Sequence, residues 1–106
     1  MIKRIQTTEE FKKLIGQNKN KKLFLLKHST RCGTSGRVFQ MIDEFSKNKD
    51  ALFAVVFVIE NRDLSNFIEA FSGIEHESPQ LIVFEKGKAV KKLYRDEITE
   101  EELEKL

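Results

Sequence analysis

Residues 23–42 read LFLLKHSTRCGTSGRVFQMI, and the change of pattern within this stretch decides the fold. The apolar run Leu23–Leu26 has the length of a buried strand, which we expect to end near Lys27 and His28. Beyond Cys32, apolar residues recur at positions 38, 41, 42 and 45, the spacing of one face of an amphipathic helix. The sequence therefore predicts a strand that runs into a helix through Cys32.

Before this stretch, Thr7 and Glu10 have the spacing of a capping box, which predicts a first helix that ends in the region of residues 16–18. A short edge strand over residues 2–6 is expected to precede it. After the stretch, nine consecutive apolar residues, 51–59, are typical of a central strand that is covered on both faces. Helices are therefore expected on both faces of the sheet.

The third helix is expected to have Asp63 as its cap and Gly73 at its left-handed end. Pro79 then opens a strand over residues 81–84, which a turn over 85–88 joins to an antiparallel strand over 89–94.

The last helix is expected to start at a second capping box, Thr99 and Glu102, flanked by the hydrophobic staple of Ile98 and Leu103. The element order βαβαβαββα predicts an α/β fold: a three-layer sandwich with a mixed central β-sheet flanked by helices.

The chain has 106 residues, no internal repeat and no linker-like segment, which predicts one domain over residues 1–106. Its formal net charge of +2 gives no reason to expect a nucleic acid or a membrane as partner. Residues 1–5 lack the apolar core of a secretory signal, so a cytoplasmic location is expected. A single cysteine excludes an internal disulfide and agrees with a reducing compartment.

Cys32 is the candidate nucleophile, because it is expected at the start of a helix, where free N–H groups and the helix dipole stabilise a thiolate. Lys27, His28, Arg31 and Arg37 add positive charge nearby in sequence. A lone cysteine is often only a small buried apolar residue, but its Gly, Thr, Ser and Arg neighbours form no apolar surrounding. The sequence therefore predicts a thiol with a lowered pKa.

Ser35 stands where a dithiol motif would have its second, resolving cysteine. A hydroxyl can donate a hydrogen bond to a thiolate but cannot form a disulfide. We therefore expect Cys32 to attack a disulfide and then to wait for a second thiol.

Four blocks of sequence resemble the monothiol bacilliredoxins, a thioredoxin-like family of the bacillithiol system, over nearly the whole chain. They are K-H-S-T at 27–30, C-x-x-S at 32–35, R-x-L-S-N at 62–66 and H-E-S-P-Q at 76–80. The resemblance implies a thioredoxin-like sheet, with Pro79 in cis facing Cys32. It also implies a thiol–disulfide oxidoreductase that removes bacillithiol from mixed disulfides on cytoplasmic proteins. Bacillithiol would then be a co-substrate, and no cofactor would be tightly bound.

The resemblance further implies that Ser78 presents backbone groups to the substrate disulfide, and that Pro79 and His76 of the same block also belong to the substrate-binding site. Lys27, Arg31 and Arg37 could pair with the carboxylates of bacillithiol. Two departures stand out, since the family commonly has T-C-P-I-S where this chain has R-C-G-T-S at 31–35, and S-H where it has Arg95 and Asp96.

Two other functions remain open. C-G-T-S is also similar to the C-G-F-S motif of monothiol glutaredoxins, some of which hold an iron–sulfur cluster with glutathione, but the Gly-Gly pair of those proteins is missing after residue 84. A thioredoxin-like module that binds peptides without redox turnover is the third possibility. The plain interpretation of His28 and His76 is two solvated side chains, and a protein-only metal site is not expected.

Overall fold

A computed structural model describes residues 2–17 and 19–106. The element order agrees with the prediction, apart from one additional turn of 3₁₀ helix, η1. The bounds are β1 Ile2–Arg4, α1 Thr8–Gln17, β2 Leu23–His28, α2 Gly33–Ser46, β3 Leu52–Phe57, α3 Arg62–Ser72, β4 Gln80–Glu85, β5 Lys88–Tyr94, η1 Arg95–Glu97 and α4 Glu100–Glu104.

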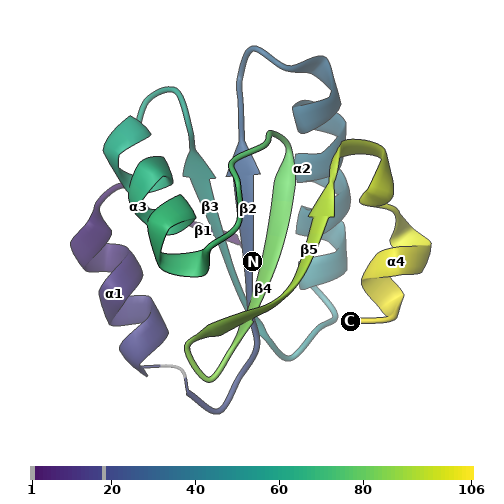
Figure 1. Cartoon of the computed structure of the whole chain (residues 1–106). Coiled ribbons are helices and arrows are strands. Elements are labelled where there is room, and N and C mark those ends of the chain that lie inside the picture. Colours follow the sequence, from purple (N-terminus) through teal and green to yellow (C-terminus); the bar gives the residue numbers. More distant parts are fainter. Residues whose placement is uncertain (1, 18) are drawn as a thin grey trace.

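The five strands form one mixed sheet in the order β1-β3-β2-β4-β5 (Figure 1). Strands β1 and β2 are both parallel to β3, whereas β4 is antiparallel to β2 and to β5. The predicted central strand over residues 51–59 is shorter than expected, because residues 58–60 form a turn. The mixed sheet and the closing antiparallel hairpin are confirmed.

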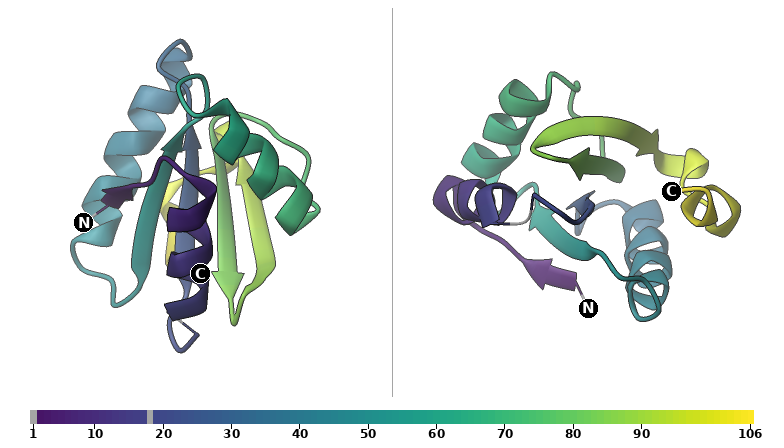
Figure 2. Two further views of the ribbon diagram at one scale, coloured as in Figure 1. Left: turned by 90° about the vertical axis from the view of Figure 1, so that its left-hand side faces the viewer. Right: turned by 90° about the horizontal axis from the view of Figure 1, so that it is seen from below.

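Helices cover both faces of the sheet, as the apolar run of β3 predicted (Figure 2). Alternate residues of β2 supply the two apolar layers, since Leu25 faces the helices α1 and α3 whereas Leu26 faces α2 and α4. Phe11 of α1 is fully buried in the first layer, and Val38 of α2 is fully buried in the second. The result is the expected three-layer α/β sandwich.

The helix starts follow the predicted caps at both ends of the chain. At α1, the Thr7 hydroxyl accepts from the backbone N–H of Glu10, whose carboxylate accepts from the N–H of Thr7 in return. At α4, the Thr99 hydroxyl accepts from the N–H of Glu102. The predicted end of α1 extends to residue 18, which lies outside the described residues, and α1 is described to Gln17.

The cap of α3 was predicted at Asp63, and this is wrong, because Asn61 precedes the helix and Asp63 lies in its first turn. Gly73 does take the left-handed conformation, with φ +73°, that ends the helix as expected. No helix in the described parts of the chain combines the length and apolarity needed to cross a membrane.

Candidate active site

Cys32 lies at the amino end of α2, at the end of the short loop that connects β2 to this helix. Its backbone is extended, with φ −108° and ψ 118°, and the helix begins at the next residue. The Cys32 N–H donates to the carbonyl of Ser29 at 3.2 Å, which fixes the residue against the loop, and its side chain is half-buried. The strand-to-helix passage through Cys32 is therefore confirmed, with the thiol where the first backbone N–H groups of α2 are free.

The pKa of the Cys32 thiol is lowered, chiefly by the backbone N–H of Ser35 in the first turn of α2, which itself donates to the Cys32 carbonyl at 3.1 Å. Partial burial opposes this effect, while the Ser35 hydroxyl, the N–H of Thr34 and the charge of Arg95 lower the pKa further. Hydrogen bonds to the charged form favour that form, so the arrangement stabilises the thiolate. The predicted direction is confirmed, and the helix start is its main cause.

Ser35 is completely buried, and its position is determined by the loop that precedes the cysteine. The N–H of Ser29 donates to the Ser35 hydroxyl oxygen at 3.3 Å, which leaves the hydroxyl hydrogen free to point at the sulfur. Ser35 therefore joins the end of β2 to the first turn of α2 and supports the thiolate, but it supplies no second thiol.

The Ser78–Pro79 peptide bond is cis, as the resemblance implied. In the register of β2 and β4, Lys27 is opposite Gln80, and one step further brings Pro79 beside His28, four residues before Cys32. Pro79 is buried and directly precedes β4, and β4 starts at the upper end of the sheet in Figure 1, where α2 also begins. Strand register thus brings the cis-proline segment and the cysteine loop to the same edge.

Arg95 also lies at this edge, and in the sequence it differs from the residue that the family commonly has at that position. Its N–H donates to the carbonyl of Pro79 at 3.0 Å, and it has φ +43°, in the left-handed region that is uncommon for residues with a side chain. Its Nε lies 3.5 Å from an oxygen of Glu77, and its charge is the one that lowers the pKa of Cys32. Arg95 therefore contacts the cis-proline segment and acts on the thiol.

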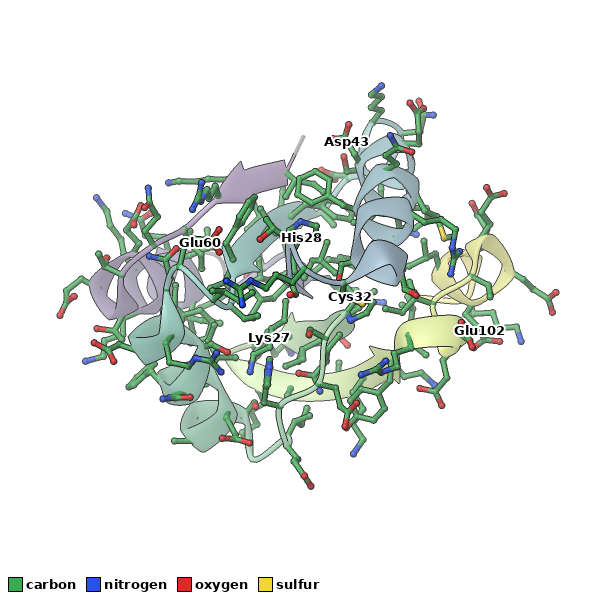
Figure 3. The ribbon with its side chains drawn as sticks, turned by 90° about the horizontal axis from the view of Figure 1, so that it is seen from above. Lys27, His28, Cys32, Asp43, Glu60 and Glu102 are labelled. Atoms are coloured by element: carbon green, nitrogen blue, oxygen red, sulfur yellow. The ribbon has the colours of Figure 1, made fainter. Side chains whose placement is uncertain are left out.

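Lys27 and His28 end β2 and point to opposite faces of the sheet (Figure 3). His28 is buried between the rings of Phe39 and Phe57, at 5.1 and 4.9 Å between centroids, and burial lowers its pKa. The interpretation of His28 as a solvated side chain is wrong, because β2 is an inner strand and is covered to its last residue.

Lys27 is fully buried, with 0% of its surface exposed. Its Nζ lies 3.1 Å from the carbonyl oxygen of Ser65 in α3 and 3.3 Å from Nδ1 of His76. His76 is therefore not a merely solvated side chain either. An interior ammonium has no surface from which to meet the carboxylate of a bound thiol, so the expected surface pairing of Lys27 is replaced by an interior role.

Arg31 and Arg37 are both exposed, one directly before Cys32 and one in the first turns of α2. They remain available to a charged ligand at this edge. Within residues 2–17 and 19–106, no group of three or more His, Cys, Asp or Glu side chains is placed to hold a metal ion.

Comparison with known proteins places this geometry among thioredoxin-like redox proteins. A protein described as having a thioredoxin fold superposes with a TM-score of 0.90 at 28% identity, covering 98% of this chain and 91% of that one. The thioredoxin of Schistosoma mansoni, at 20% identity, gives 0.82 over 98% and 92% of the two chains. The thioredoxin of Fasciola hepatica, at 19%, gives 0.81 over 97% and 93%.

These superpositions establish the thioredoxin fold that the resemblance implied. Within that fold, the sequence matches the family described as monothiol bacilliredoxin BrxC over residues 3–103. A match of this extent includes Cys32, Ser35 and the cis-proline segment in one alignment, and the family and fold together support a redox role. The chain therefore belongs to the monothiol bacilliredoxin BrxC family.

Proposed function

We propose that this protein is a monothiol thiol–disulfide oxidoreductase that removes bacillithiol from mixed disulfides on cytoplasmic proteins. The Cys32 thiolate attacks the bacillithiol sulfur, so that a new S–S bond forms between Cys32 and bacillithiol while the original S–S bond breaks. The electron pair of the broken bond leaves on the sulfur of the target protein, which takes up a proton from water. The target is reduced and Cys32 is oxidised to the mixed disulfide.

One observation carries the proposal: an activated thiol starts α2, and a buried serine stands three residues later in place of a second thiol. Because the chain has no other cysteine, it cannot release bacillithiol from Cys32 by itself. A small thiol must attack the Cys32–bacillithiol disulfide, which frees Cys32 and leaves a disulfide of the two small thiols.

The surroundings of Cys32 suit a ligand that combines a disulfide with carboxylates. The backbone of Ser78, before the cis bond, is the proposed docking group for the disulfide, in the manner of the family. Arg31 and Arg37 are exposed, one residue before and five residues after Cys32 in the sequence, and can pair with the carboxylates of bacillithiol. Arg95, whose charge acts on the thiol, adds a third cation. Bacillithiol acts as co-substrate, and the reaction requires no tightly bound cofactor.

The deciding experiment uses one target protein that carries either bacillithiol or glutathione on the same cysteine. Intact-mass spectrometry should show release of the target and one added bacillithiol mass on this protein, which Cys32→Ser cannot acquire. Equal or faster removal of glutathione would contradict the assignment of bacillithiol. Removal of neither would favour a glutaredoxin-like cluster carrier or a non-catalytic binding module.

A further inference from the structure

The least expected feature of the interior is a lysine ammonium below the active-site edge. The four residues of β2 that precede Lys27, Leu23 to Leu26, all have buried apolar side chains. A charged group in this position is expensive to desolvate, and an apolar side chain of the same length would pack there at lower cost. The contacts of Lys27 indicate what the charge does.

Lys27 connects three segments that are distant in sequence. From β2, its Nζ reaches the Ser65 carbonyl on α3 and the Nδ1 atom of His76 in the connection between α3 and β4. An ammonium group is only a donor, so Nδ1 must accept and the proton of the neutral imidazole is on Nε2. The ammonium therefore holds the ring of His76 in a single orientation.

The His76 ring is suited to accept this bond because its pKa is lowered, first by burial and then by the charges of Lys27 and Arg62. The carboxylates of Glu69 and Glu77 oppose that shift in part. The ring is therefore neutral at pH 7, as an acceptor must be. Glu69 also accepts from the backbone N–H of His76 at 2.8 Å, which fixes the main chain at the same residue.

Residues 73–79 form neither helix nor strand, yet they carry the cis-proline segment. Three contacts hold them from the inside: Lys27 to the His76 ring, Glu69 to the His76 N–H, and the side-chain amide of Gln80 to the carbonyl of Glu75 at 2.9 Å. His76 is two residues before Ser78. A shift of its ring would therefore displace the backbone that docks the substrate.

We propose that Lys27 is a positioning residue of the reaction: from the interior, its ammonium holds His76 and thereby sets the Ser78–Pro79 segment at the place where a disulfide meets Cys32. Lys27 touches neither the thiol nor the substrate. This inference deepens the proposed function and rests on it only for the identity of the substrate disulfide. The contact of Lys27 with His76 is the same whichever small thiol the substrate disulfide contains.

The charge of Lys27 also gives the proposal a distinctive pH dependence. Burial lowers the pKa of Lys27 to about 8, although the nearby carboxylate of Glu69 opposes the shift. Above that pH the amine is neutral and donates a weaker hydrogen bond to His76. The rate on a disulfide should then decline above about pH 8 even though the Cys32 thiolate is fully formed.

The test compares Lys27→Met with Lys91→Met, which changes an exposed lysine of β5. With a bacillithiolated peptide at pH 7, we expect Lys27→Met to react about tenfold more slowly, the effect of one lost charge-assisted hydrogen bond. Its alkylation by iodoacetamide, which needs no docking segment, should stay within about twofold of wild type. The decline above pH 8 should be absent from Lys27→Met and present in Lys91→Met.

A second pair of variants separates positioning from general loss of structure. His76→Asn retains an acceptor oxygen near the place of Nδ1, whereas His76→Leu has none. We expect the asparagine variant to keep most of the disulfide rate and the leucine variant to match Lys27→Met. Equal disulfide rates in wild type and Lys27→Met, or an equal loss of alkylation, would overturn the proposal.

Hydrogen exchange supplies a readout that does not depend on the substrate. In Lys27→Met, the amides of His76, Glu77 and Ser78 should exchange about tenfold faster, while that of Val83 within β4 should be unchanged. If wild type fails to attack the bacillithiolated peptide, the proposed function fails, and this exchange pattern still decides the positioning role. Unchanged exchange at all three amides would refute the role of Lys27 by itself.

Discussion

The active-site edge contains two charged groups that the protein stabilises in opposite ways. Cys32 is half-buried at a helix start, and backbone N–H groups of its own neighbours favour its charged form. Lys27 is completely buried, and burial disfavours its charged form, although side chains and a carbonyl from other segments surround it. The thiolate is thus produced by local backbone geometry, whereas the ammonium is kept by tertiary contacts at a cost in stability.

The largest effect is expected on the free energy of unfolding, which should show whether the buried charge of Lys27 destabilises the folded protein. In the unfolded chain the Lys27 pKa should be near its ordinary value of 10.5, and in the folded chain it is about 8. Between these values the unfolded chain retains a proton that the folded chain has released, so the free energy of unfolding rises with pH. The full penalty of roughly 3 kcal/mol is present below about pH 8 and is absent from Lys27→Met.

Urea unfolding at pH 7 and at pH 10.5 measures this difference. The stability of wild type should increase by roughly 3 kcal/mol relative to Lys27→Met between the two pH values. The variant should be at least as stable as wild type at pH 7, because methionine fills a similar volume without a charge. A stability difference that does not change with pH would mean that the ammonium is not desolvated in the folded protein.

The same contrast explains what could be predicted from sequence. The thiol site depends on contacts among residues 29–35, so an apolar strand, a helical spacing and a cysteine between them were enough to locate it. The capping boxes at Thr7 and Thr99 are local in the same sense, and both were confirmed. The prediction of Asp63 as the cap was wrong because α3 begins two residues earlier, after Asn61, so the carboxylate lies in the first turn and not at the cap.

The interior contacts of Lys27 with Ser65 and His76 could not be predicted from a local sequence pattern. The apolar run of β2 stops at Leu26, and a lysine and a histidine after it look like solvated residues at a strand end. The strand continues through both because β3 pairs with it on one side up to His28, and β4 on the other up to Lys27. The partners of Lys27 lie 38 and 49 residues away in sequence, beyond any local pattern.

A smaller effect is expected when the local support of the thiol is weakened. Ser35→Ala removes the hydroxyl donor to the sulfur but leaves the backbone N–H groups of residues 34 and 35 in place. The Cys32 pKa should therefore rise without reaching its ordinary value, and alkylation at pH 6.5 should slow about fivefold, the effect of one hydrogen bond. The measurement is the rate of iodoacetamide modification as a function of pH.

Ser46→Ala is the matched control for this prediction. Ser46 is also a buried serine of α2, but its hydroxyl donates to the carbonyl of Asp43 at the far end of the helix. Its alkylation profile should coincide with that of wild type. If Ser35→Ala also coincides with wild type, the thiolate owes its stability to the backbone alone, and the contrast with the interior lysine becomes sharper.

The smallest effect is expected at Arg95, where a long-range charge, and no hydrogen bond, acts on the thiol. The Arg95 side chain is 59% exposed and forms an ion pair with Glu77. Solvent and this ion pair therefore both screen the effect of its charge on Cys32. Arg95→Gln should raise the Cys32 pKa only slightly and slow alkylation by less than about twofold in dilute buffer.

Two comparisons determine whether that small effect is electrostatic. In 1 M salt, where the screening length falls to about 3 Å, the difference between Arg95→Gln and wild type should vanish. Glu77→Gln should act in the opposite direction, because it frees the Arg95 guanidinium from its carboxylate partner and leaves more positive charge near the sulfur.

A different result would be that both variants slow alkylation equally at every salt concentration. The ion pair would then act on the thiol by holding the backbone beside Pro79, to whose carbonyl the Arg95 N–H donates, and not by its charge. Arg95 would then belong with Lys27 among the groups that place the docking segment, and the helix start would be the main source of thiolate stability.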